Sequence, residues 1–220
     1  MDLFVIGDVH GCYHTFRAVL RHWRPRLELL VQVGDLVDRG HGIPECVALA
    51  RELEAAHPGR TVFLLGNHEH SMLRHYGPQG PHRAWLSWGG QATVDQYQGR
   101  PKMLREHLVW LHERPLFWAN DHIVISHAGF ADTPTPLEPD DYDGVLWRRG
   151  PLLNLAGRRQ VVGHTPTPDG EILLDPLANA LYVDTGAYLN RGLTGVRLSA
   201  AGEVLAEFAV PTSPLDIDLD

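Results

Sequence analysis

The first third of the chain alternates short apolar runs with amphipathic segments. Continuous apolar runs at residues 3–6, 29–33 and 61–65 predict three buried strands. Between them, apolar residues spaced three and four apart predict helices over residues 16–23 and 43–56. Strands that are apolar on both faces and separated by helices are typical of an α/β sheet with parallel pairing. We therefore expect functional residues to gather where these strands end.

The remainder of the chain predicts a helical middle and a strand-rich end. Helices are expected at residues 84–97, with a break at Gly89-Gly90, and at residues 102–112. Strands are expected at residues 122–126, 160–162, 171–174 and 180–183, followed by a hairpin of residues 194–198 and 203–209. The Pro-rich acidic stretch at residues 132–143 predicts an exposed loop, which is either a passive connection or a substrate-facing segment. We expect one domain over residues 1–210 and an acidic tail over residues 211–220, frayed from Asp216 onward.

Composition excludes several classes of protein. The formal net charge of −8, without a cluster of Lys and Arg, argues against a nucleic-acid-binding surface. An acidic protein that handles phosphate needs a local positive field, and bound divalent metal ions supply the largest such charges. No apolar run is long enough to span a bilayer and the N-terminus has no signal-peptide pattern, so we expect a cytoplasmic protein. Cys12 and Cys46 are expected to be small buried residues in helices, not disulfide partners.

Candidate metal ligands occur in five short loops that follow apolar runs. Each of the first three predicted strands ends in a glycine followed by Asp or Asn, and two later loops contain histidine. The five stretches are Gly7-Asp8-Val9-His10-Gly11, Gly34-Asp35-Leu36-Val37-Asp38-Arg39-Gly40, Gly66-Asn67-His68-Glu69, Ser126-His127-Ala128-Gly129 and Gly163-His164-Thr165. Carboxylate and imidazole donors suit Mn, Fe, Zn or Ni, and the flanking glycines permit tight turns. Together these loops predict a metal site.

Motifs of three other enzyme classes are incomplete or missing. His68-Glu69 resembles the start of the zinc-protease HExxH motif, but Met72 stands where the second histidine is required. The sequence has no GxxxxGK[ST] phosphate loop, which disfavours an NTP-driven enzyme. It has no GxSxG elbow either, which disfavours a serine hydrolase.

The five stretches resemble the phosphoprotein phosphatase family within the calcineurin-like metallophosphoesterases. The signatures GDxHG, GDxVDRG and GNHE are present in order, and the resemblance runs from residue 5 to residue 190. Trp85-Leu86 followed by Gly89-Gly90, together with the short chain, resembles the bacterial and phage serine/threonine phosphatase branch. Eukaryotic members carry HGG where this chain has Ala128 in the middle position. The resemblance implies two mixed β-sheets packed as a sandwich and flanked by helices, with metals at the loop ends on one edge.

The resemblance also implies a role for each site residue. Two divalent ions are expected, Mn²⁺ first and Fe, Zn or Ni as alternatives. One ion would bind Asp8, His10 and Asp35, and the other would bind Asp35, Asn67, His127 and His164. A hydroxide shared by the two ions would attack phosphorus directly, without a phosphoenzyme. His68 would protonate the leaving oxygen while Asp38 orients its ring.

Four residues are expected to face the substrate, namely Arg39, Arg149, Asn67 and Tyr188. Arginine geometry suits bidentate contact with phosphate oxygens. Arg149 is chosen because Trp147-Arg148-Arg149 resembles the Trp-x-Arg pattern of the bacterial branch, and Arg148 is the alternative. For Tyr188, a place in the site and simple packing are both open.

The resemblance implies a hydrolase of phosphomonoesters, acting on phosphoserine or phosphothreonine in proteins. The alternative is symmetrical cleavage of diadenosine tetraphosphate, by enzymes that tend to be longer and to have GNHD where this chain has Glu69. A non-catalytic metal-binding scaffold is a weaker alternative, because a scaffold needs neither His68 nor Asp38. We expect a phosphorylated protein or a small phosphoester as partner, with no nucleic acid and no membrane. The metal identity, the natural substrate and the oligomeric state are left open.

Overall fold

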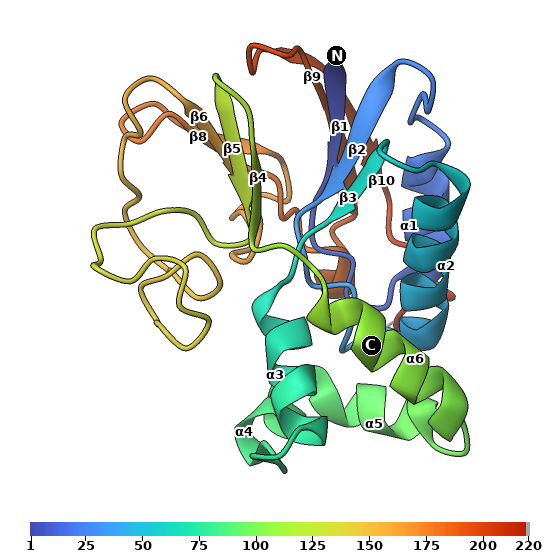
Figure 1. Ribbon diagram of the computed structural model, residues 1–220. Helices are drawn as coiled ribbons and strands as arrows, with labels where there is room; N and C mark the ends of the chain where they lie inside the picture. The colour runs from blue at the N-terminus through green and yellow to red at the C-terminus, as the bar shows by residue number, and fades with distance from the viewer. Residues whose placement is uncertain (219–220) are drawn as a thin grey trace.

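Two five-stranded sheets pack face to face in the computed structural model, which describes residues 1–218 (Figure 1). The first sheet has the order β10-β9-β1-β2-β3 and consists of β1 (Asp2–Ile6), β2 (Glu28–Gln32), β3 (Thr61–Phe63), β9 (Leu193–Leu198) and β10 (Val204–Val210). The second has the order β4-β5-β6-β8-β7 and consists of β4 (Phe117–Ala119), β5 (Ile123–Ser126), β6 (Arg159–Val162), β7 (Leu173–Asp175) and β8 (Ala180–Tyr182). Each sheet combines parallel and antiparallel pairs, so the sandwich of two mixed sheets is confirmed.

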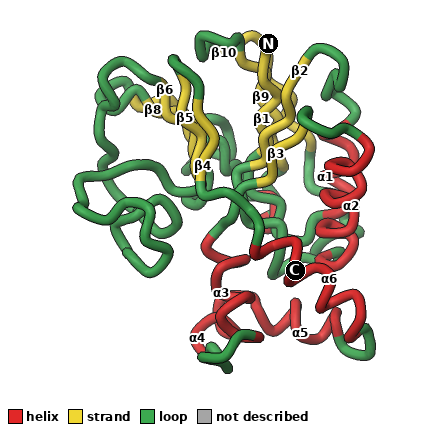
Figure 2. The backbone as a smooth tube through the Cα atoms, viewed as in Figure 1, coloured by secondary structure: helices red, strands yellow, loops and turns green. Residues whose placement is uncertain are grey.

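The helices lie on the side of the first sheet and beneath its strand ends (Figures 1 and 2). The outer face of the first sheet is covered by α1 (Tyr13–Leu20) and α2 (Ile43–Ala56). A layer near the carboxyl ends of β1, β2 and β3 contains α3 (Asn67–Tyr76), α4 (Arg83–Trp85), α5 (Gln91–Tyr97) and α6 (Pro101–His112). One turn of π-helix at Leu86–Gly90 joins α4 to α5, and a 3₁₀ turn occurs at Ala187–Leu189. None of the helices within residues 1–218 combines the length and the apolar character needed to cross a membrane.

Strand β1 is buried on both faces, and its alternate side chains enter two separate cores. Phe4 belongs to the core beneath the helices, together with Phe16 of α1. Val5 points the other way and belongs to the core between the sheets, together with Val161 of β6. Successive side chains of a strand point to opposite faces, so burial on both sides produces the continuous apolar run in the sequence. This double burial fixes β1, and the loop that follows it, between the two layers.

Most predicted elements are present, with a few differences. Helix α3 was not predicted because its sequence is polar and begins with the expected ligand Asn67. The short strand β4 was also missed. The helix predicted over residues 84–97 is divided because Gly89 has φ 115°, which a helix does not allow. Residues 132–143 contain no helix or strand, as predicted.

The beginning of the acidic tail is not frayed. Asp216 is 1% exposed, and its carboxylate accepts hydrogen bonds from the backbone N–H groups of His14 and Thr15 at 2.9 and 2.8 Å. These are free N–H groups in the first turn of α1, where a negative charge is favoured. The prediction of fraying was therefore wrong for Asp216, because its carboxylate caps a helix some 200 residues earlier in the chain. Residues 219–220 of the predicted tail lie outside the described residues.

Candidate metal centre

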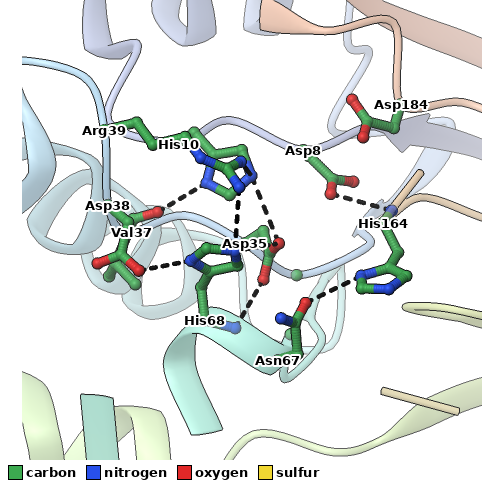
Figure 3. A network of polar contacts seen from close by, with 12 residues as sticks. Asp8, His10, Asp35, Val37, Asp38, Arg39, Asn67, His68, His164 and Asp184 are labelled. Carbon is green, nitrogen blue, oxygen red and sulfur yellow. Dashed lines mark hydrogen bonds and ion pairs between the residues drawn. The ribbon is translucent and has the colours of Figure 1, made fainter. Parts of the chain in front are cut away.

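Strands of both sheets end at one common region of the molecule. The side chains delivered there are Asp8 after β1, Asp35 after β2, Asn67 after β3, His127 after β5, His164 after β6 and Asp184 after β8. Figure 3 shows Asp8, Asp35, Asn67, His164 and Asp184 around one centre. All six predicted metal ligands are between 0 and 5% exposed. The structure thus gathers residues more than 150 positions apart, as in the 3.0 Å hydrogen bond from the His164 backbone N–H to Asp8 Oδ2.

Asp35 is common to two groups of potential metal ligands. His10, Asp35 and His68 offer atoms within 4.8 Å of one another, and so do Asp35, His127 and His164. Asp35 Oδ2 lies 3.4 Å from the Nε2 atoms of both His10 and His127. This carboxylate therefore has the position expected of a ligand shared between two metals.

Three histidines are oriented so that one ring nitrogen faces the centre. The other nitrogen meets a backbone carbonyl: His10 Nδ1 meets Val37 O at 2.9 Å, His127 Nδ1 meets Val33 O at 3.0 Å and His164 Nε2 meets Trp147 O at 3.1 Å. A carbonyl only accepts, so that nitrogen carries the hydrogen and the other presents a lone pair. Burial lowers the pKa of all three rings, which keeps them neutral. Neutral imidazoles with oriented lone pairs are what metal ions require.

The carboxylates of the centre need a positive charge beside them. Asp8 Oδ1 is buried without a hydrogen-bond partner. Burial, followed by the nearby charges of Asp184 and Asp35, raises the pKa of Asp8. Burial also raises the pKa of Asp184 to about 7. Clustered buried carboxylates are costly unless cations neutralise them, so these residues fit bound divalent ions. Asp8 itself lies outside both three-residue groups described above.

Asp184 was not among the predicted site residues. The signal was available, because Asp184 directly follows the apolar run at residues 180–183, much as Asp8 and Asp35 come just after the first two apolar runs. Its Oδ1 accepts a hydrogen bond from Gly186 N–H at 3.0 Å, which leaves its carboxylate beside Asp8 (Figure 3).

Several site residues have backbone conformations that are rare outside glycine. Positive φ angles occur at His10 (46°), Asp35 (58°), Asp38 (73°), Arg39 (73°) and His164 (67°). Such residues persist only where the surrounding structure holds them, and they concentrate at functional sites. The glycines of the motifs supply the space: a Cβ on Gly163 would stand 2.0 Å from Asp8 Oδ1.

Glu69 holds the loop that carries Asp35. Its buried carboxylate accepts four backbone hydrogen bonds, from Gly66 at 2.9 Å, Asp35 at 2.7 Å, Leu36 at 2.8 Å and Val37 at 3.0 Å. An aspartate, one methylene shorter, would not reach the same four groups from this position in α3. Glu69 thus faces backbone, and the difference between GNHE and GNHD concerns how this loop is held. The presence of GNHE instead of GNHD is therefore weaker support for a protein substrate than the sequence suggested.

His68 and Asp38 form a buried pair beside the metal ligands. His68 Nδ1 lies 2.5 Å from Asp38 Oδ2. The same oxygen accepts a hydrogen bond from Trp85 Nε1 at 2.6 Å, and Thr93 Oγ1 donates to Asp38 Oδ1 at 2.5 Å. Burial lowers the pKa of His68, but the charges of Asp35 and Asp38 and the bond to Asp38 outweigh it, so the pKa is raised. The pair therefore favours a protonated imidazole whose Nε2 faces the centre, 3.9 Å from Asp35 Oδ2.

Arg39 and Tyr188 lie together at the centre. The Arg39 guanidinium carbon is 3.8 Å from the centroid of the Tyr188 ring, and its Nη2 is 3.3 Å from His68 Nε2. Tyr188 also meets the His10 ring edge to face at 5.0 Å. Stacking on an aromatic ring holds a guanidinium while leaving its N–H groups free for an anion. The structure thus places Tyr188 beside Arg39, with which it was grouped, and beside the predicted ligand His10.

Arg149 lies near His127 and His164, whereas Arg39 contacts His10 and His68. It is exposed, and its Nη1 is 3.4 Å from Thr165 Oγ1, next to His164. Arg148, the alternative, is instead tied to Asp143 at 2.5 Å and to the carbonyl of Pro151. Arg149 is therefore the arginine that is free to meet a phosphoryl group.

Known proteins with similar sequences and structures include protein phosphatases and dinucleoside tetraphosphatases. The sequence profile of the calcineurin-like phosphoesterases matches residues 1–194. Serine/threonine-protein phosphatase 1 of Salmonella typhimurium is 32% identical, over 89% of this chain and 91% of its own length. A symmetrical bis(5'-nucleosyl)-tetraphosphatase of Methylobacillus flagellatus is 31% identical, over 66% of this chain and 54% of its own length. A solved serine/threonine phosphatase of Saccharomyces cerevisiae superposes with a TM-score of 0.67 at 17% identity, over 97% of this chain and 81% of that one.

Proposed function

Because the chain belongs to the calcineurin-like phosphoesterase family, we propose that it hydrolyses phosphoserine and phosphothreonine in proteins. The observation that carries the proposal is the combination of a metal-ligand cluster sharing Asp35 with a separate pair, His68 and Asp38, at 2.5 Å. A scaffold that only bound metal ions would use neither member of this pair. Their burial in one hydrogen-bonded network supports an enzyme.

We assign metal binding to the six buried ligands Asp8, His10, Asp35, Asn67, His127 and His164. Two divalent ions, when bound there, would neutralise phosphoryl charge and lower the pKa of water toward neutrality. Mixed carboxylate, amide and imidazole donors accept Mn²⁺, our first choice, as well as Fe, Zn or Ni. Asn67 Oδ1 lies 2.8 Å from His127 Nε2 and 3.0 Å from His164 Nδ1, so its oxygen joins these two rings in one donor set.

The protein's own groups would handle the leaving oxygen and the phosphoryl charge. His68 Nδ1 is bonded to Asp38, so the proton that His68 delivers is the one on Nε2, which faces the centre. Asp38 stabilises the charged His68 ring before the proton is transferred and fixes the orientation of the ring. Arg39, beside Tyr188, and Arg149, beside Thr165, would bind the non-reacting phosphoryl oxygens.

The charge available at the centre supports a protein substrate. Two arginines and two metal ions suit one phosphoryl group on a peptide, which needs few other contacts. Four linked phosphates would bring more negative charge to a protein whose formal net charge is already −8. Symmetrical cleavage of diadenosine tetraphosphate is the second candidate, and the tetraphosphatase relative supports it.

The test compares kcat/KM for a phosphothreonine peptide and for diadenosine tetraphosphate at the same saturating Mn²⁺ concentration. We expect the phosphopeptide to have the higher value. A higher value for diadenosine tetraphosphate, with two molecules of ADP as product, would overturn the proposal in favour of the second candidate.

A further inference from the structure

The outer face of the second sheet carries no helix within residues 1–218. Figures 1 and 2 show loop beside this face, whereas α1 and α2 cover the first sheet. Leu181 of β8 points into the core between the sheets, so its neighbour Tyr182 points outward. Leu173 is paired directly with Tyr182 across the β7–β8 ladder and therefore shares this outer face. Part of the outer face is thus apolar and uncovered.

A cavity of about 500 Å³ runs along this face and ends beside the loops that carry His127 and His164. At one end it is lined by Ala128, Gly163 and Thr165, the direct neighbours of His127 and His164. At the other end it is lined by Leu177 and Ala178, in the turn between β7 and β8. Strand β8 rises about 3.3 Å per residue, so the cavity extends roughly 10 Å from the catalytic loops.

The cavity has a cationic end and a far end where Leu177 and Ala178 lie beside Asp175, whose carboxylate accepts a hydrogen bond from the Leu177 N–H at 2.8 Å. Arg149 lies at the end next to His164. Leu177 is 85% exposed at the far end, and Leu173 beside the cavity is 47% exposed. Leu152 and Tyr182 line the wall between them and are half-buried. Exposed apolar side chains that gather along a groove mark surfaces that meet another molecule.

We propose that this groove holds an extended apolar segment of the substrate protein, next to the phosphorylated residue. The inference rests on the proposed function and adds a preference among protein substrates. The phosphoryl group would lie at the Arg149 end, where its charge is complemented. Roughly three extended residues would then fit along the groove, with apolar side chains on Leu173 and Leu177. The substrate is favoured over a separate partner because the groove ends at Arg149 and at the loops that carry His127 and His164.

The experiment uses two phosphothreonine peptides that differ only beside the phosphorylated residue. One has Leu and Val at the three positions on either side, and the other has Gly and Ser. Each is assayed with the wild type, with the double variant Leu173→Ser/Leu177→Ser and with the control Leu27→Ser. Leu27 is 60% exposed and precedes β2, at the end of the sheet opposite to the catalytic loops. p-Nitrophenyl phosphate, which has no flanking residues, reports the basal activity.

We expect the wild type and Leu27→Ser to prefer the apolar peptide by roughly 10-fold in kcat/KM. The double variant should lose this preference through KM with kcat unchanged, because the contact is equally present before and during the reaction. Its activity on p-nitrophenyl phosphate should equal that of the wild type.

Four results would overturn the proposal. Equal kcat/KM for the two peptides with the wild type would refute the groove while leaving the protein-phosphatase function intact. Hydrolysis of p-nitrophenyl phosphate but of neither peptide would refute both. A loss confined to diadenosine tetraphosphate in the double variant would assign the groove to a nucleobase. A wild-type dimer that the double variant converts to a monomer, seen by sedimentation, would assign the face to a second copy.

Discussion

Trp85 lies 47 residues beyond Asp38, yet its indole Nε1 donates a hydrogen bond to Asp38 Oδ2 at 2.6 Å. Thr93 Oγ1 donates to the other oxygen of the same carboxylate at 2.5 Å. Both donors are fully buried and come from the helical layer beneath the strand ends. The carboxylate that orients His68 is therefore held by α4 and α5 as well as by the motif loop that contains it.

Replacing Trp85 by Phe removes one of these hydrogen bonds while keeping an aromatic ring in the core. We expect kcat to fall roughly 10-fold on a phosphothreonine peptide, because a buried hydrogen bond to a charged group is worth about 1.5 kcal/mol or more. The loss should be smaller on p-nitrophenyl phosphate, whose leaving group needs little protonation. Trp110→Phe is the matched control, since Trp110 Nε1 donates to Glu54 at 2.6 Å, away from the centre. The same loss in the control, or equal losses on both substrates, would contradict a role in orienting His68.

Replacing His68 by Asn should leave metal content unchanged and lower kcat on phosphopeptides by roughly 10²–10⁴-fold. The reason is that His68 Nδ1 is committed to Asp38, so the ring is assigned a proton and not a metal. Metal content is measured by mass spectrometry on the purified variant. Hydrolysis rates are measured on a series of substrates that differ in leaving-group pKa. Loss of a metal ion, or an equal loss of rate on all substrates, would show that His68 has another role.

Replacing Glu69 by Gln turns one accepting oxygen into an N–H donor that faces backbone N–H groups. The bonds to Asp35 at 2.7 Å and Gly66 at 2.9 Å share one oxygen, and those to Leu36 and Val37 share the other. We expect metal affinity to fall roughly 10–100-fold, as for other residues that orient metal ligands. Competition with a chelator measures this affinity, and Glu45→Gln on the surface of α2 is the control. Unchanged affinity would mean that Glu69 does not determine the position of Asp35.

His107 predicts a pH dependence of stability that is independent of the metal centre. Its side chain is buried, with Nδ1 2.6 Å from the Tyr97 hydroxyl, and burial lowers its pKa from 6.5 to about 4. His107 is therefore harder to protonate in the folded state than in the unfolded state. Its contribution to the free energy of unfolding is fully present above pH 6.5 and is lost as pH falls toward 4. Denaturant unfolding at several pH values should show a smaller loss of stability over this range for His107→Gln than for the wild type. Identical slopes would contradict the assignment to His107.

The positions of Asp8, Asp35 and Asn67 follow from the sequence, because carboxyl ends of parallel strands meet at one edge of a sheet. Two kinds of information are missing from the local pattern. The sequence predicts only an ordinary core residue at Trp85, because nothing near it in sequence shows that its N–H donates to Asp38. The sequence shows Glu69 only as part of a motif, because its hydrogen bonds with backbone N–H groups are visible only in the folded chain. Long-range hydrogen bonds of this kind depend on how the layers pack, which periodicity does not encode.

The central claim is that Asp35 is shared by two metal ions, and metal content tests it most directly. The wild type and Asp35→Asn are loaded with Mn²⁺, freed of excess metal, and analysed for ions per folded chain by mass spectrometry. We expect two ions in the wild type and fewer than one in Asp35→Asn, because this carboxylate belongs to both groups of potential ligands. A single ion in the wild type, or two ions retained by folded Asp35→Asn, would contradict it.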